Sequence, residues 1–103
     1  MVITEIIHKI LEVYAIQHGV DAWHINCGQC EDFALDVIEA MGLDSFSMFW
    51  HDGMPDCTEE EAYTFAHCFI RYDGRFYDSE CPEGVDSWRE LPYFIAAALA
   101  IPA

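Results

Sequence analysis

A cysteine that could act as a nucleophile stands in the stretch from Asn26 to Ala34, which reads Asn-Cys-Gly-Gln-Cys-Glu-Asp-Phe-Ala. The glycine predicts a loop and the residues after Cys30 predict a helix, whose free N–H groups and positive dipole end would stabilise a thiolate. Glu31 and Asp32 suit that dipole, but their negative charge should raise the pKa of Cys30 unless an imidazolium approaches it. Cys30 is the candidate nucleophile, and it needs a base and a group that orients the base.

A β-hairpin later in the chain can supply both groups. Aromatic and β-branched residues in segments 64–72 and 75–80 flank Asp73-Gly74, the kind of dipeptide that best accepts a two-residue type I′ turn. The turn predicts which residues of the two strands face one another.

Pairing Tyr72 with Arg75 places His67 and Asp78 on one face as diagonal neighbours, with backbones about 7–8 Å apart. An imidazole and a carboxylate can meet across that distance, whereas a slip of one residue would put them on opposite faces. Glu80 lies opposite His67 in this register and is an alternative orienting carboxylate.

Residues just before Cys30 could bind the substrate. Backbone N–H groups at the start of the helix could hold the oxyanion that forms on an attacked carbonyl, helped by the side-chain amide of Gln29 or Asn26. Trp23 lies in the preceding connection and could line a pocket. We treat Gln29, Asn26, Trp23 and Glu80 as candidate binding residues.

The order of these features resembles the core of transglutaminase-like proteins within the papain-like cysteine-enzyme group. The resemblance covers roughly residues 26–80 and depends on Gly28-Gln29-Cys30, Phe33-Ala34, His67 and Asp78. It implies that Cys30 attacks an amide carbonyl, that His67 moves the proton and that Asp78 orients His67. The implied activity is that of a thiol hydrolase or acyl transferase of amide or isopeptide bonds.

The elements that must position these groups can be predicted from apolar periodicity. A first helix would begin at a Thr4 cap and end at Gly19, and a central helix would run from Cys30 to Gly42 with one buried face. Segment 21–29 is expected to be a connection.

Alternation in segment 46–50 predicts a strand, and Thr58 with Glu61 has the spacing of a capping box. Segment 81–84 is expected to end the hairpin. After it, Pro92 suits the first position of a closing helix, to which we assign packing and no chemistry. These elements predict a single α+β domain over 1–103, with the N-terminal helix and the Cys-bearing helix packed on an antiparallel sheet of three or four strands.

The charge of the chain limits its partners. Its 103 residues are 53% hydrophobic, and nineteen acidic against four basic residues give a net charge of -15. Such a surface repels nucleic acid and anionic membrane. The expected partners are a protein or peptide substrate and a basic protein. The alternative function is that of a non-catalytic acidic binding protein, such as a nucleic-acid mimic or an inhibitor of a host protein.

A small zinc-binding domain is another alternative, because Cys27 and Cys30 have ligand spacing and Cys68, Cys81 or His67 could complete the site. A second pair of cysteines with such spacing is missing, and the predicted register turns Cys68 away from His67. A redox pair of Cys27 and Cys30 fits less well, since no strand leads into the motif. We expect neither a metal nor another cofactor.

The five cysteines are an odd number, and residues 1–5 lack a basic signal-like region. We therefore expect reduced thiols and a cytoplasmic location. The small size and acidity are compatible with a virus-encoded or accessory intracellular protein.

Overall fold

The computed structural model describes residues 2–100, which form an α+β fold with a four-stranded antiparallel sheet in the order β1-β2-β3-β4. The helices are α1 (Val2–His18), α2 (Ala22–Gly28), α3 (Cys30–Met41), α4 (Glu59–Thr64) and α5 (Pro92–Ala100). The strands are β1 (Met48–Trp50), β2 (Cys68–Tyr72), β3 (Arg75–Asp78) and β4 (Cys81–Val85). Short 3-10 turns occupy Ser45–Ser47, His51–Gly53 and Trp88–Glu90.

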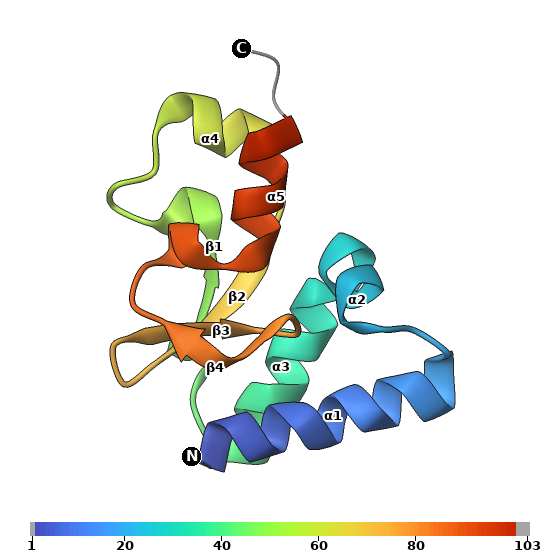
Figure 1. Cartoon of the computed structure of the whole chain (residues 1–103). Coiled ribbons are helices and arrows are strands. Elements are labelled where there is room, and N and C mark those ends of the chain that lie inside the picture. Colours follow the sequence, from blue (N-terminus) through green and yellow to red (C-terminus); the bar gives the residue numbers. More distant parts are fainter. Residues whose placement is uncertain (1, 101–103) are drawn as a thin grey trace.

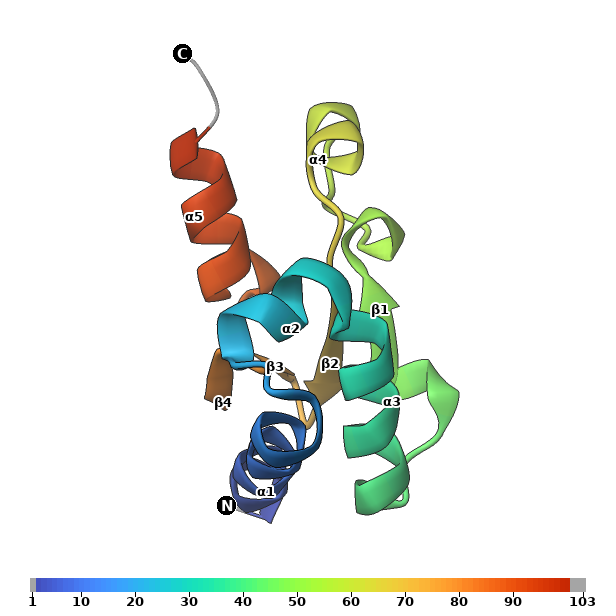
Figure 2. The same cartoon turned by 90° about the vertical axis from the view of Figure 1, so that its right-hand side faces the viewer.

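The sheet is buried on both faces, and this explains why β2 and β3 are rich in buried residues. Helices α1 and α3 cover one face with a cluster that contains Ile3, Ile7, Tyr14, Ile25, Phe33, Ala34, Val37, Cys68, Ile70 and Tyr77. A second cluster includes the first turn of α5 and contains Phe65, Phe69, Phe76, Cys81, Trp88, Leu91 and Phe94. Figures 1 and 2 show α4 and α5 at one end of the molecule and α1 at the other.

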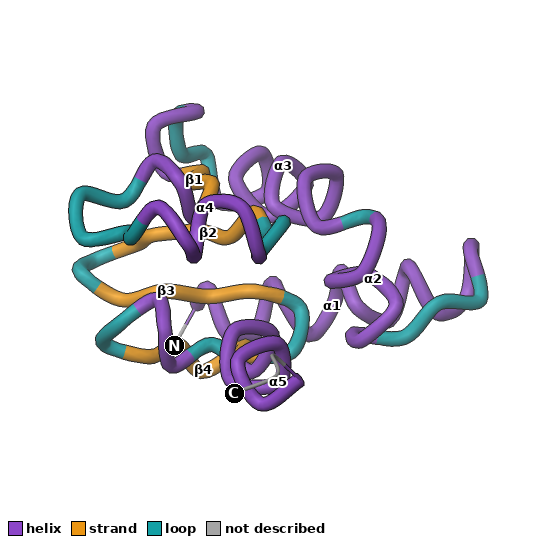
Figure 3. The backbone as a smooth tube through the Cα atoms, turned by 90° about the horizontal axis from the view of Figure 1, so that it is seen from above, coloured by secondary structure: helices purple, strands orange, loops and turns teal. Residues whose placement is uncertain are grey.

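The β2–β3 hairpin has the predicted turn and register. Asp73 and Gly74 have φ values of 52° and 75°, as a type I′ turn requires, and Tyr72 pairs with Arg75. The predicted strands are too long, because β2 begins at Cys68 and not at residue 64, and β3 ends at Asp78 and not at residue 80. His67 therefore lies immediately before β2. In Figure 3 the turn from β2 to β3 and the turn from β3 to β4 lie at opposite ends of β3.

Other local predictions are also confirmed. Gly19 and Gly42 follow α1 and α3 with positive φ values of 66° and 69°. Thr58 and Glu61 form both hydrogen bonds of a capping box, and Pro92 is the first residue of α5.

Two predictions about helix boundaries are wrong. Thr4 lies inside α1, which already includes Val2, so it is not the cap. The segment expected to be a connection contains α2, whose N-cap Asp21 accepts a hydrogen bond from the His24 backbone N–H at 3.0 Å. Because α2 ends at Gly28 and α3 begins at Cys30, the candidate nucleophile lies at the junction of two helices.

Two predictions about strands are also wrong. Segment 81–84 belongs to β4, which pairs with β3 through Asp78 and Cys81, so the sheet continues past the hairpin. Segment 46–50 is a strand only from Met48 onward, because a 3-10 turn capped by Asp44 precedes it.

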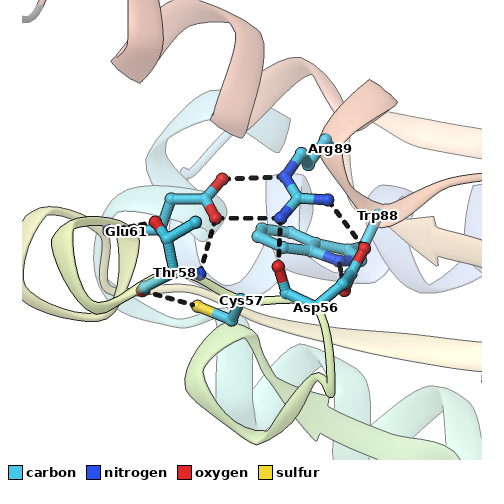
Figure 4. A network of polar contacts seen from close by, with 6 residues as sticks. All are labelled: Asp56, Cys57, Thr58, Glu61, Trp88 and Arg89. Atoms are coloured by element: carbon cyan, nitrogen blue, oxygen red, sulfur yellow. Dashed lines mark hydrogen bonds and ion pairs between the residues drawn. The ribbon is translucent and has the colours of Figure 1, made fainter.

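A polar network connects α4 to the segment that leads into α5 (Figure 4). The Arg89 guanidinium donates to Glu61 at 2.8 and 2.9 Å and to the Asp56 carboxylate at 2.7 Å. The Trp88 indole N–H also donates to Asp56, at 2.9 Å, and Arg89 lies over the Trp88 ring. The network therefore helps to place α5 against the sheet. None of the helices among residues 2–100 has the length and apolar character needed to cross a membrane.

Candidate active site

The imidazole of His67 and the carboxylate of Asp78 are in direct contact. The distance between His67 Nε2 and Asp78 Oδ2 is 2.8 Å, and the two side chains are 0% and 2% exposed. His67 precedes β2 and Asp78 ends β3, so the hairpin register brings them together as predicted. A contact so completely shielded from water fixes the orientation of the ring.

Asp78 is held by further donors. Its Oδ1 accepts the backbone N–H of Glu80 at 2.9 Å, and its Oδ2 also lies 3.4 Å from the Asn26 amide nitrogen. That nitrogen donates to Glu80 Oε1 at 2.9 Å. The Ser79 hydroxyl lies 2.7 Å from both Asn26 Oδ1 and the Ala22 carbonyl and can donate to either. These bonds fasten α2 to the β3–β4 turn.

This network changes the roles expected of two candidate residues. Because the Asn26 side-chain N–H groups are directed at Asp78 and Glu80, they are not free to bind an oxyanion. Glu80 contacts Asn26, whereas Asp78 contacts His67, so Asp78 is the carboxylate that orients the ring. Asn26 and Glu80 instead position Asp78.

The Cys30 thiol lies at the start of α3, half-buried, and interacts with the His67 ring. Burial raises the pKa of Cys30, but the neighbouring His67 ring and the N–H groups of Cys68 and Glu31 together outweigh it, so the net pKa is lowered. Glu31 and Asp32 are expected to raise the pKa of Cys30, but the net pKa is lowered.

The pKa of His67 moves in the opposite direction. Burial lowers it, but the hydrogen bond with Asp78 and the nearby Cys30 sulfur outweigh burial and raise the pKa above its ordinary value. Among the described residues His67 Nδ1 has no hydrogen-bond partner of good geometry. A lowered thiol pKa beside a raised imidazole pKa favours a thiolate–imidazolium pair.

Helix α5 covers the His67 ring. Tyr93 stacks on it with ring centroids 4.3 Å apart and an angle of 20° between the planes, and Phe94 meets it edge-on at 5.4 Å. The Tyr93 hydroxyl accepts the Ala66 N–H at 3.1 Å. The sequence predicts only packing for this helix, and the adjacent aromatic pair after Pro92 is its one signal of a contact with the site.

The remaining candidate binding residues lie around this centre. Gln29 is half-buried between α2 and α3, and its side chain makes no capping hydrogen bond to α3. Trp23 on α2 is 57% exposed. A cavity of about 380 Å³ is lined by Trp23, Asn26 and Glu80 together with residues of α5.

The zinc alternative lacks a complete set of ligands. Cys27 is exposed, whereas Cys68 and Cys81 are buried, and all five cysteines are free. Within residues 2–100, no three or more His, Cys, Asp or Glu side chains are grouped so that they could hold a metal ion. Cys27 and Cys30 therefore have no third ligand in this part of the chain.

Comparisons with models of protein families, with curated proteins and with solved structures found no match to this chain. The arrangement of Cys30, His67 and Asp78 is thus the main guide to function.

Proposed function

We propose that this chain is a cysteine-dependent hydrolase or acyl transferase that acts on amide or isopeptide bonds. Cys30 is the nucleophile, His67 the general acid and base, and Asp78 the residue that orients His67. The observation that carries the proposal is the buried contact of 2.8 Å between His67 Nε2 and Asp78, which leaves Nδ1 for the thiol. This division of the two ring nitrogens is what a cysteine–histidine–carboxylate triad needs.

In the proposed reaction the Cys30 thiolate attacks the carbonyl carbon, and the C=O π electrons move to oxygen. Backbone N–H groups near the start of α3 and the Gln29 amide are the candidate donors to that oxyanion. The imidazolium of His67 gives its Nδ1 proton to the leaving amine as the C–N bond breaks and a thioester forms. Water or a second amine then gives a proton to His67 and attacks the thioester, which releases the Cys30 thiolate.

A protein or peptide is the proposed substrate. The net charge of -15 favours basic partners over nucleic acid or anionic lipid. The five free cysteines fit a reducing compartment, so the proposal includes a cytoplasmic location.

Alkylation of the native protein with iodoacetamide tests the nucleophile. Exposure alone would make the exposed Cys27 react fastest, but the pKa of Cys27 is raised by burial and by Glu80, whereas that of Cys30 is lowered. Peptide mapping by mass spectrometry should show Cys30 reacting faster than Cys27 and Cys57. The midpoint of its pH profile should lie below that of ordinary cysteine. Equal rates at the three cysteines would remove the support for an activated thiol.

Turnover separates an enzyme from a protein that merely holds a reactive thiol. Hydrolysis of p-nitrophenyl acetate should continue beyond one equivalent and stop in Cys30→Ala. The Cys57→Ala variant is the control, because Cys57 lies in a loop outside the site. A single burst without turnover would contradict the hydrolase. Added glycine methyl ester then tests acyl transfer, since a transferase passes the acyl group to the amine in preference to water, and Cys30→Ala should form no more amide than the uncatalysed reaction.

A further inference from the structure

The cavity of about 380 Å³ adjoins the proposed catalytic residues. It is bounded by Trp23, Asn26 and Cys27 of α2, by Glu80 after β3, and by Tyr93 of α5. Its volume is within the range of small-ligand pockets and exceeds that of a single amino-acid side chain.

Three observations connect the cavity to the thiol and the imidazole. Tyr93 stacks on His67, so one ring separates the cavity from the base. The Asn26 side-chain amide, which lines the cavity, donates hydrogen bonds to both Asp78 and Glu80. Cys27 lines the cavity at the end of α2, three residues before Cys30 at the start of α3. The cavity therefore adjoins the residues that cover His67 and position Asp78.

The chemistry of the cavity favours a cation. Glu80 uses Oε1 for the Asn26 contact, so Oε2 remains for a ligand. Glu80 brings a carboxylate to the wall of the cavity, and its charge is also one of the effects that raise the pKa of Cys27, after the larger effect of burial. Trp23 and Tyr93 add aromatic faces, which attract ammonium and guanidinium groups.

The basic residues of the chain do not fill this role themselves. Arg75 pairs with Asp86, and Arg89 pairs with Asp56 and Glu61. Arg71 lies over Phe76, and Lys9 is exposed on α1. The described residues that line the cavity include no lysine or arginine. A positive group would have to come from a ligand.

We propose that this cavity is a subsite for the positively charged side chain of a lysine or arginine in the peptide substrate, close to the carbonyl that Cys30 attacks. The assignment to substrate rests on the proposed function, whereas binding of the cation does not. Glu80 forms the ion pair, and Trp23 and Tyr93 supply the cation–π contacts. Glu80 is thus the residue that determines specificity.

A binding titration tests the subsite without any turnover. The probes are acetyl-arginine methylamide and acetyl-citrulline methylamide, which have nearly the same shape but differ in charge. Binding is followed through the NMR signal of the Trp23 indole N–H, assigned with Trp23→Phe. We expect a saturable shift with the arginine probe and an affinity at least tenfold weaker with the citrulline probe. Equal affinities would overturn the proposal.

Charge removal supplies a matched pair of variants. Glu80→Gln should weaken binding of the arginine probe at least tenfold. Glu83→Gln removes the same charge from an exposed position on β4 outside the cavity and should change binding less than twofold. Equal effects in the two variants would mean that the overall acidity of the chain, and not the cavity, attracts the probe.

The Cys30→Ala variant keeps this test separate from the test of catalysis. It should bind the arginine probe as the native chain does. If the arginine probe binds but Cys30 of the native chain is unreactive, the cation site is supported and the proposed enzyme is contradicted. If Cys30 is reactive but the probe does not bind, the enzyme is supported and the cation site is contradicted. In the active protein, kcat/KM for cleavage of acetyl-arginine p-nitroanilide should be at least tenfold higher than kcat/KM for acetyl-citrulline p-nitroanilide. If the two are cleaved equally while agmatine speeds release of the acyl group, the cation belongs to an acceptor amine and the substrate assignment is overturned.

Discussion

Replacing Asp78 with asparagine tests how the carboxylate controls the thiol. In the native chain Oδ1 accepts from the Glu80 N–H, while Oδ2 faces His67 Nε2 and the Asn26 amide nitrogen. An asparagine has one acceptor oxygen and one NH₂ group. If the asparagine NH₂ takes the place of Oδ1, it faces the Glu80 N–H, which is also a donor. If the NH₂ takes the place of Oδ2, it faces the Asn26 N–H and the proton on His67 Nε2.

Either placement of the amide removes the negative charge that favours imidazolium. With the NH₂ at the Oδ2 position, neutral His67 would accept at Nε2 and carry its proton on Nδ1, on the side of Cys30, where it could no longer act as a base. A hydrogen bond to a charged group is worth about 1.5–3 kcal/mol, and about 1.4 kcal/mol corresponds to a factor of ten. We therefore expect alkylation of Cys30 near neutral pH to slow by about 10- to 100-fold.

The sign of the pH effect follows from the two pKa shifts. Asp78 is among the groups that raise the pKa of His67, and His67 is among those that lower the pKa of Cys30. Without the carboxylate, burial of Cys30 is opposed less strongly, so its pKa rises. The alkylation profile of Asp78→Asn should therefore move to higher pH.

The assay is the pH dependence of iodoacetamide alkylation at Cys30, with ¹⁵N NMR of His67 to assign the tautomer. Asp36→Asn is the matched control: Asp36 accepts from the Tyr14 hydroxyl at 2.6 Å and takes no part in the hydrogen bonds of Asp78. Circular dichroism in the near ultraviolet checks that both variants are folded. If Asp78→Asn and Asp36→Asn share the native profile, the carboxylate does not control the thiol and the reasoning is refuted.

Two further predictions concern stability, measured by urea unfolding. Gly84→Ala should destabilise the fold by about 2–5 kcal/mol, since Gly84 has a φ of 80° and a Cβ there would lie 2.6 Å from the Tyr77 ring. Gly53→Ala is the control, because a Cβ at Gly53 meets open space, and an equal loss of stability in the two variants would contradict the prediction. Arg89→Met should cost about 1 kcal/mol at pH 7, a small value because Arg89 is 39% exposed and screened by solvent. The hydrogen bond with Arg89 is the largest cause that lowers the pKa of Glu61, from 4.5 to about 2, so this contribution is present above pH 4.5 and is lost as the pH falls toward 2. A difference between native and variant protein that persists unchanged at pH 2 would disprove the role of Glu61.

The contact between His67 and Asp78 could be predicted because one local signal sets the whole register. Asp73 and Gly74 adopt positive φ values that few other dipeptides tolerate, so the turn can form at one place only. Once Tyr72 faces Arg75, every other pair in the hairpin is counted from it. A site built on such a turn is visible in a single sequence.

Helix α2 and strand β4 could not be predicted in this way, because distant contacts stabilise them. Helix α2 has only seven residues, too few to be stable alone, and is held by buried Ile25 and by the bonds of Asn26 to the β3–β4 turn. Strand β4 includes Pro82 and Gly84, which read locally as a turn. Its pairing with β3 overrides that local preference.

The role of Tyr93 escaped prediction for a related reason. The residues near Tyr93 in the sequence give no sign of a contact with His67. The contact depends on the position of α5, which the hydrogen bonds of Arg89 and the packing of Trp88 against Phe94 determine. Apolar periodicity identifies a packing helix but not the partner of each ring.

The pKa of Cys30 is lowered in a chain whose composition is strongly acidic. A chain with four basic residues and nineteen acidic ones offers little positive charge to stabilise a thiolate. Apart from His67, the groups that lower the pKa of Cys30 are backbone N–H groups, those of Cys68 and Glu31. Asp78 likewise accepts from the backbone of Glu80 and from an amide. The pKa of Cys30 is thus lowered by His67, which Asp78 orients, and by dipoles that the fold fixes, and none of these groups belongs to the charged surface. We therefore expect that the surface charge can change without disturbing the thiol.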